Sequence, residues 1–409
     1  MKKKRDFEGN RLHHFELSDK NRTVRWVLIV ILLVIAALAL TAGLTSALQT
    51  PAGWHTVEGN SVELNCGGDF VLRYEYGAGK DSATAESKAL ELLYGRTVED
   101  AWNLFFNEAG SSDLAGIFAI NQHPNEEITI DGGLYRALEQ IVGSGSRALY
   151  LAPVYAEYDR VFYSESDGAA REFDPGQNAQ QREYVQLLAD YANDPQAIQI
   201  VLRADNKVML QVSEEYLAFT EENEVQNLVD FGWLRNAFIA DYIASKLTDN
   251  GFTNGYIASV DGFTRNLDSR ENSYSLNVFN KNGESVELAA VMDYSSPKSL
   301  VFLRGYPMYD QEYLRYYVFA DGRIVTAMID PADGQSKAAT DNLVAYSEDL
   351  GCGQLALSVM PVYVADTLAE EALNALAEQG IYSVWFRGKQ LMHSQKDLKI
   401  AVNPPYYTK

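Results

Sequence analysis

The longest apolar run of the chain lies near its N-terminus. Residues 26–48 read WVLIVILLVIAALALTAGLTSAL and contain no charged side chain. A helix needs about 20 apolar residues to cross the hydrocarbon of a bilayer, so this run predicts one transmembrane helix. Arg22 and Arg25 precede it, and no lysine or arginine follows until Arg73. The positive-inside rule therefore predicts that residues 1–25 form a cytoplasmic basic tail and that the rest of the chain is extracytoplasmic.

A cleaved signal peptide is the alternative interpretation of the same run. Its apolar core usually spans only about 7–15 residues, and Thr45-Ser46-Ala47 is the cleavage candidate. We favour an uncleaved signal-anchor in the cell membrane with a single span. Loss of the first 47 or so residues from the mature protein would show cleavage instead.

Apolar spacing near 3.6 residues predicts several helices in the outer part of the chain. They cover residues 82–107, 132–143, 179–193, 232–249 and 365–379. Alternating runs predict a hairpin over 198–213 with Asp205-Asn206 at its turn. Further strands are expected within 61–77, around 255–260, 273–280, 285–291, 298–303, 315–319 and 323–328, and as a final pair over 381–393.

Three segments have no such periodicity. Residues 49–60 predict a linker, and residues 108–131 and 164–178 predict irregular structure. Strands and helices are interspersed without strict βαβ alternation, which favours one α+β domain over residues 61–409.

Charge is spread unevenly along the chain. The net charge is −22, yet residues 1–25 hold eight lysines and arginines against four acidic residues. The outer domain is therefore strongly acidic, which argues against nucleic acid as a partner and agrees with a soluble surface. The two cysteines, Cys66 and Cys352, are too few for a disulfide scaffold, and the sequence leaves open whether they pair.

Two segments are candidates for chemistry. Asp230-Phe231-Gly232 leads from a strand end into a helix whose N-terminal N–H groups can receive a phosphate. Asp330-Pro331 follows a strand, and its carboxylate can ligate Mg²⁺. An ordinary β–α turn and an ordinary Asp-Pro turn are the alternatives that these residues alone favour.

Six short segments, taken together, carry a resemblance to a known family. They are Ser112 to Asn121, Ser146 to Tyr150, Asp230 to Asp241, Val260 to Phe263, Ala327 to Pro331 and Cys352 to Val359. In this order they resemble the motifs of the ApbE family, the FAD:protein FMN transferases, over roughly residues 68–395. The resemblance implies an ApbE-like, T-fold-related domain of mixed sheets and packed helices. It also implies FAD and Mg²⁺ as cofactors and a flavin acceptor protein as partner.

Several motif positions depart from the family pattern. Asn236 stands at the family's lysine, Ala327 at its histidine, and Tyr150 at a carboxylate. The metal-binding Asp and Thr of the late helix correspond to Gly353 and Leu357. Positions that keep the pattern, and so are the candidates for cofactor binding, are Asp230, Gly232, Asp241, Gly262 and Asp330.

These losses favour a non-catalytic relative, because Mg²⁺ requires near-octahedral oxygen ligands. We expect a binding or assembly domain near a flavin-dependent redox complex or flavoprotein. The first alternative is an active Mg²⁺-dependent transferase that flavinylates Thr or Ser of a partner, with Asp261, Asp330 and Asp333 as replacement ligands. The second is a domain that binds flavin without chemistry.

Overall fold

The computed structural model divides the chain into two compact units, Met1–Pro51 and Ala52–Lys409. The described residues are 22–47, 49–58, 65–79, 82–108, 114–268, 272–295, 298–309, 312 and 314–408. Within the first helix, burial is described for residues 26–41.

The predicted membrane segment forms a helix, α1 (Arg22–Ala47). Its large apolar side chains are exposed, for example Trp26 at 59% and Leu32 at 64%. Among the described residues, no helix satisfies the joint requirement of length and hydropathy for crossing a bilayer. The single span therefore stays a prediction from the sequence.

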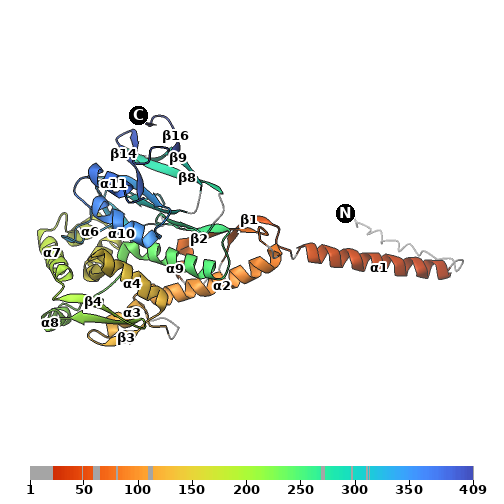
Figure 1. Cartoon of the computed structure of the whole chain (residues 1–409), viewed down its shortest axis with the longest axis horizontal. Helices are drawn as coiled ribbons and strands as arrows, with labels where there is room; N and C mark the ends of the chain where they lie inside the picture. The colour runs from red at the N-terminus through yellow and green to blue at the C-terminus, as the bar shows by residue number, and fades with distance from the viewer. Residues whose placement is uncertain are drawn as a thin grey trace, which may run out of the picture. The chain divides into compact units, whose positions relative to one another are not determined.

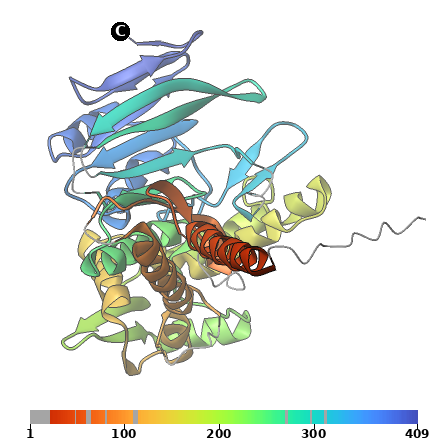
Figure 2. The ribbon, with the colours of Figure 1, turned by 90° about the vertical axis from the view of Figure 1, so that its right-hand side faces the viewer.

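A nine-stranded sheet organises the second unit (Figures 1 and 2). Neighbouring strands pair antiparallel except the last two, which are parallel. The strand order is β1 (Gly53–Val57), β2 (Phe70–Tyr76), β6 (Gly255–Ser259), β7 (Phe263–Asn266), β10 (Ser299–Arg304), β13 (Asn342–Ser347), β14 (Tyr382–Arg387), β15 (Gln390–His393) and β17 (Tyr407–Thr408).

The central strands of this sheet are covered on both faces. Every residue of β10 and β13 is buried, as expected for strands between two layers. Val301 faces the core that α9 (Arg235–Asp249) and α10 (Cys352–Tyr363) build with α2 (Ala83–Phe105). Its neighbour Leu300 faces a second core beneath the small sheet β16-β9-β8.

The remaining elements complete these layers. The helices are α3 (Ile117–Gln122), α4 (Gly132–Ser144), α5 (Ala152–Phe162), α6 (Asp167–Phe173), α7 (Ala179–Asn193), α8 (Glu214–Glu222) and α11 (Glu370–Ala377). The short 3-10 helices are η1 (Asn65–Asp69), η2 (Ala148–Leu151) and η3 (Gly232–Leu234). The other strands are β3 (Glu127–Thr129), β4 (Ile198–Arg203), β5 (Lys207–Val212), β8 (Ser273–Asn282), β9 (Ser285–Ser295), β11 (Tyr316–Val318), β12 (Ile324–Thr326) and β16 (Lys399–Val402).

Most predicted helices and strands are present, and the irregular segments are where the predictions fail. The segment 49–60 is not wholly a linker, because its residues 53–57 form edge strand β1. Residues 108–131 contain α3 and β3, and residues 164–178 contain α6, which Ser166 caps through the N–H of Ala169. The pair over 381–393 is not the last, because β16 and β17 follow. Cys66 and Cys352 are both buried free thiols, so they do not pair.

Candidate functional site

Two cavities lie beside α9, and several of the candidate residues line one or the other. The larger, about 1030 Å³, is lined by Asp230, Gly232, Asn236 and Ala327 together with Asp261. The smaller, about 460 Å³, is lined by Asp241. The structure thus brings four of the predicted positions together.

Asp230 organises the start of η3 at the larger cavity. Its Oδ1 accepts hydrogen bonds from the N–H of Gly232 at 2.5 Å and from Nη2 of Arg235 at 2.6 Å. The guanidinium of Arg235 also lies 4.3 Å from the ring centre of Phe106. Gly232 has φ +54°, and a Cβ there would lie 2.4 Å from the ring of Tyr155. Arg235 therefore already neutralises the carboxylate of Asp230. Position 232 requires glycine because its φ is positive and because the ring of Tyr155 leaves no space for a Cβ.

Asn236 links two carboxylates instead of supplying the family's positive charge. Its Nδ2 donates to Asp69 Oδ2 at 3.3 Å and to Asp261 Oδ2 at 3.1 Å. Arg315 forms ion pairs with the same two carboxylates: its Nη2 lies 3.3 Å from Oδ2 of Asp69, and its Nη1 lies 3.2 Å from Oδ2 of Asp261. Burial raises the pKa of Asp69, and Arg315 opposes that rise. The cation of this cluster thus comes from position 315.

Asp330 lines neither cavity and has its own internal cation. Its Oδ1 accepts from the N–H of Ala332 at 2.9 Å, and its Oδ2 lies 2.8 Å from Nζ of Lys337. The same ammonium lies 2.7 Å from Asp333 and 3.3 Å from Asp366. This arrangement agrees with the interpretation of Asp330-Pro331 as a turn.

A side chain at position 353 would require the ring of Phe238 to shift. A Cβ at this position would lie 2.5 Å from Cε1 of Phe238. Leu357, one turn later in α10, is 6% exposed and belongs to the main core. The ring of Phe238 and the packing of Leu357 therefore fill the space around these two positions of α10.

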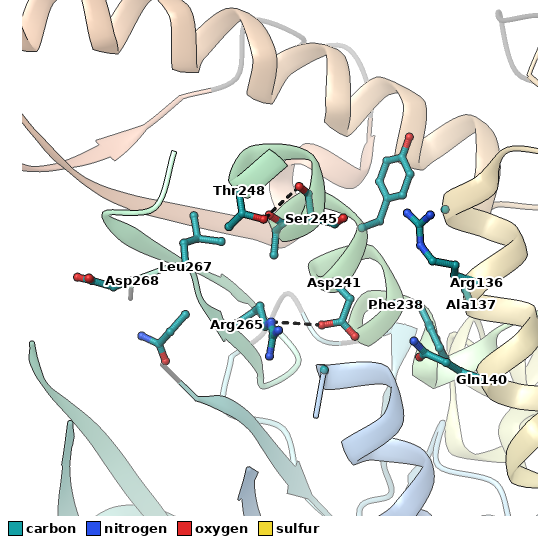
Figure 3. Close-up of a pocket in the computed structure, with 15 residues that line it drawn as sticks. Arg136, Ala137, Gln140, Phe238, Asp241, Ser245, Thr248, Arg265, Leu267 and Asp268 are labelled. Atoms are coloured by element: carbon teal, nitrogen blue, oxygen red, sulfur yellow. Dashed lines mark hydrogen bonds and ion pairs between the residues drawn. The ribbon is translucent and has the colours of Figure 1, made fainter. Parts of the chain in front are cut away.

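Asp241 holds the N-terminus of α10 from the side of α9. Its two oxygens accept hydrogen bonds from the N–H groups of Cys352 and Gly353, each at 2.9 Å. Figure 3 shows Asp241 and Arg265 facing each other at the smaller cavity, with 3.8 Å between Oδ1 and Nε. Carboxylates bind well at such helix ends. The structure therefore gives Asp241 a structural role as a helix cap.

Gly262 and Tyr150 are also structural. Gly262 has φ +103°, and a Cβ there would lie 2.4 Å from the carbonyl oxygen of Phe302, whose N–H donates back to Gly262 O at 2.8 Å. The hydroxyl of Tyr150 accepts from the N–H of Ile200 at 2.9 Å. Neither residue lines the two cavities. The early motif residues Ser112 and Asp113 lie outside the described residues.

Magnesium does not fit the residues present. Among the described residues, no three His, Cys, Asp or Glu side chains are grouped so that they could hold a metal ion. Asp330 and Asp333 already bind an ammonium group, and Asp261 binds a guanidinium. A divalent ion would have to displace these internal cations.

Comparison with known proteins rests on structure alone. No family model matches the chain, and no curated protein matches its sequence. The ApbE protein of Thermotoga maritima matches with a TM-score of 0.54 at 12% identity, over 86% of this chain and 97% of its own. A variant of the flavin transferase ApbE of Vibrio cholerae gives 0.52 at 12% identity, over 86% and 98%. The chain has an ApbE-like fold.

A third match has the same character. The flavinyl transferase ApbE of Pseudomonas stutzeri, in its apo form, gives a TM-score of 0.50 at 12% identity over 84% of this chain and 94% of its own. The fold predicted from the resemblance is therefore confirmed. At this identity the likeness says nothing about whether the ApbE-like unit of this chain catalyses a reaction.

Four further residues of the larger cavity were not predicted from the sequence: Asp69, Asp159, Arg235 and Arg315. They come from η1, α5, the start of α9 and the residue before β11. Since they are far apart in the chain, no local spacing marks them. Asp69 after two glycines and Arg235 five residues after Asp230 were the only local signals.

Proposed function

We propose that this chain is a membrane-anchored, extracytoplasmic ApbE-like protein that does not transfer FMN. It acts as a binding or assembly domain beside a flavin-dependent redox system. The observation that carries the proposal is the position of Phe238, 2.5 Å from where a Cβ of residue 353 would lie. Without a metal at the transferring phosphate, the charge that develops there goes uncompensated, and that electrostatic contribution is usually the largest in catalysis.

The internal cations support the same proposal. Lys337 and Arg315 neutralise the carboxylates that could have replaced the lost ligands. A metal ion would have to displace these cationic groups and give up part of its own hydration, which makes the exchange unfavourable. The competing function, a working transferase with ligands from Asp261, Asp330 and Asp333, requires this exchange.

A flavin transfer assay tests the proposal directly. The purified protein is incubated with FAD, Mg²⁺ and a threonine-containing acceptor peptide, with an active ApbE transferase as positive control. We expect no gain of FMN mass on the peptide and no release of AMP. AMP release that requires Mg²⁺ and disappears in Asp330→Asn would establish the competing function instead.

A further inference from the structure

The larger cavity carries more negative than positive charge. Its lining includes Asp69, Glu108, Asp159, Asp230, Asp261 and Glu312, but only two guanidinium groups, Arg235 and Arg315. Glu312 is paired with the buried Arg304 behind the wall, at 2.7 Å. Low-dielectric walls concentrate the field of such charges inside a cavity. The interior therefore repels an anion such as a pyrophosphate.

Internal pairing leaves part of this charge without a counterion. Arg235 neutralises Asp230, whereas Arg315 serves both Asp69 and Asp261. The carboxylate of Asp159, on α5, makes no hydrogen bond or ion pair with any side chain that the structure describes. Asp159 is exposed to solvent at the cavity, yet desolvation by the surrounding residues and the nearby charge of Asp230 raise its pKa to about 6, and the charge of Arg235 opposes that rise. A cation placed here would stabilise its ionised form.

Aromatic side chains form much of the remaining wall. They include Trp102, Phe106, Tyr155, Tyr163, Trp233 and Tyr309. Trp102 and Phe106 are stacked with ring centres 4.0 Å apart, and the guanidinium of Arg235 already lies over Phe106. Aromatic faces attract cations, and most strongly where water is excluded.

Three aromatic residues of this wall have groups that a ligand could contact. Tyr163 is 64% exposed and Tyr309 is 57% exposed, so their rings are open at the rim. The indole nitrogen of Trp233, a side chain only 9% exposed, is buried and has no hydrogen-bond partner among the residues that the structure describes. Buried polar atoms usually have partners, and this N–H donor calls for an acceptor oxygen on the body of a ligand, since an ammonium group has none to offer.

We propose that the cavity binds an organic cation, a molecule with an ammonium or quaternary ammonium group on an apolar body. Asp159 faces the charge, and the aromatic wall contacts the apolar body. This inference deepens the proposed function and rests on it, because it names the ligand class of the same ApbE-like cavity. Its volume of about 1030 Å³ is large enough for a drug-sized molecule.

The test compares a cation with its neutral isostere on the full-length protein in a non-ionic detergent. Choline and 3,3-dimethylbutan-1-ol have nearly the same shape and differ in charge. Isothermal titration should show choline binding at least about tenfold more tightly than the alcohol. Choline should also raise the unfolding temperature by mass action, and FAD should not.

Two variants locate the binding site. Asp159→Asn should weaken choline binding about tenfold, because it removes the charge and keeps the shape. Tyr163→Leu removes one exposed ring and should weaken it several-fold; its exposed position makes loss of folding unexpected. Glu183→Gln, an exposed acidic residue of α7 away from the cavity, is the matched control and should leave binding unchanged.

Each contrary result has a definite meaning. Equal affinity for choline and the alcohol, no binding of either, or unchanged choline binding in both cavity variants would overturn the inference. Binding of FAD in place of choline would do so as well. FMN transfer to an acceptor peptide would overturn the proposed function, and this is measured separately as peptide mass.

Discussion

Residue 353 illustrates how a neighbouring side chain can limit what one position holds. A carboxylate side chain at position 353 would need space, and the ring of Phe238 occupies that space. Leu357 reinforces the change, since its side chain is buried in the core. Restoring the family's residue types at these two positions would therefore require Phe238 to move.

The first prediction concerns Gly353→Ala. The added methyl group should lower the free energy of unfolding by about 1–3 kcal/mol, because it overpacks the contact with Phe238. Urea unfolding followed by circular dichroism measures the loss. Gly143→Ala is the matched control: Gly143 is also helical, a Cβ there meets nothing within 4 Å, and the change should stabilise by about 0.5 kcal/mol.

Combining Gly353→Asp with Phe238→Ala gives a sharper test of the same contact. If the ring is the obstacle, the double variant should lose less stability than the sum of the single variants. Strict additivity would show that Phe238 does not control position 353.

The second prediction concerns pH and Asp159. Its pKa is about 6 in the folded protein and about 3.9 in an unfolded chain. The folded state therefore binds the proton more tightly, so this contribution to stability is present below about pH 4 and lost as the pH rises through about 6. Because the carboxylate is open to the cavity, we expect a modest effect.

Asp159→Asn should flatten this part of the pH dependence. The measurement is the free energy of unfolding in urea at several pH values between about 4 and 7, with Glu183→Gln as the control. A variant curve parallel to that of the unmodified protein would contradict the raised pKa.

At the scale of elements, Asp241 joins α9 to α10. Its carboxylate satisfies two N–H groups at the start of α10 that the helix itself leaves free. Gly351, the residue before the helix, makes no side-chain cap. The position of α10 against the sheet therefore depends on a residue from another helix.

The third prediction is that Asp241→Ala lowers the free energy of unfolding by about 1–2 kcal/mol, as for loss of a helix cap. Asp241→Asn should lose less, because an amide oxygen still accepts one bond. Asp131→Ala is the comparison, since Asp131 caps α4 within its own chain segment through the N–H of Gly133. An unchanged midpoint in Asp241→Ala would exclude the capping role.

The accuracy of the predicted elements follows the length and periodicity of each segment. Helix α7 was predicted with its observed bounds, and Asp205 and Asn206 have the positive φ values of 61° and 56° that a tight hairpin turn favours. Helix α5 was missed because Pro153 stands at its first turn, where proline starts a helix but looks like a breaker. Strand β13 is buried at all six positions and so shows no alternation.

The candidate site was less predictable than the fold. Asp230 and Gly232 were found from a local turn pattern, and the structure places both at the larger cavity. Asp159 and Arg315 reach that cavity only through the packing of α5 and the approach to β11. Ion pairs such as Arg315 with Asp69 connect residues 246 positions apart in the chain, which one sequence does not reveal.

At the scale of the whole molecule, two units with different composition follow each other along the chain. The apolar segment 26–48 precedes a folded unit with a charge of −26, because the net charge is −22 and residues 1–25 carry +4. An acidic surface keeps such a unit soluble and away from anionic lipid. This division agrees with an anchor followed by an outer domain.

The fourth prediction is that the chain stays intact in the membrane. Its measured mass in detergent should include residues 1–47, and alkaline washing of membranes should not release it. A chain with its first residue near position 48 would show a cleaved signal peptide. Replacing Leu32 and Leu33 by arginine should prevent membrane retention, whereas replacing them by alanine should retain it.

The two buried free cysteines can report local opening of the folded unit through their reaction with an alkylating reagent. Burial raises the pKa of the Cys66 thiol to about 12 and that of Cys352 well above its usual value, so both are protonated and shielded. Only the thiolate reacts with an alkylating reagent. The alkylation rates of Cys66 and Cys352 would therefore measure how often η1 and the start of α10 unfold locally. A ligand that fills the larger cavity should slow the alkylation of Cys66, which precedes the wall residues Gly68 and Asp69 in the chain.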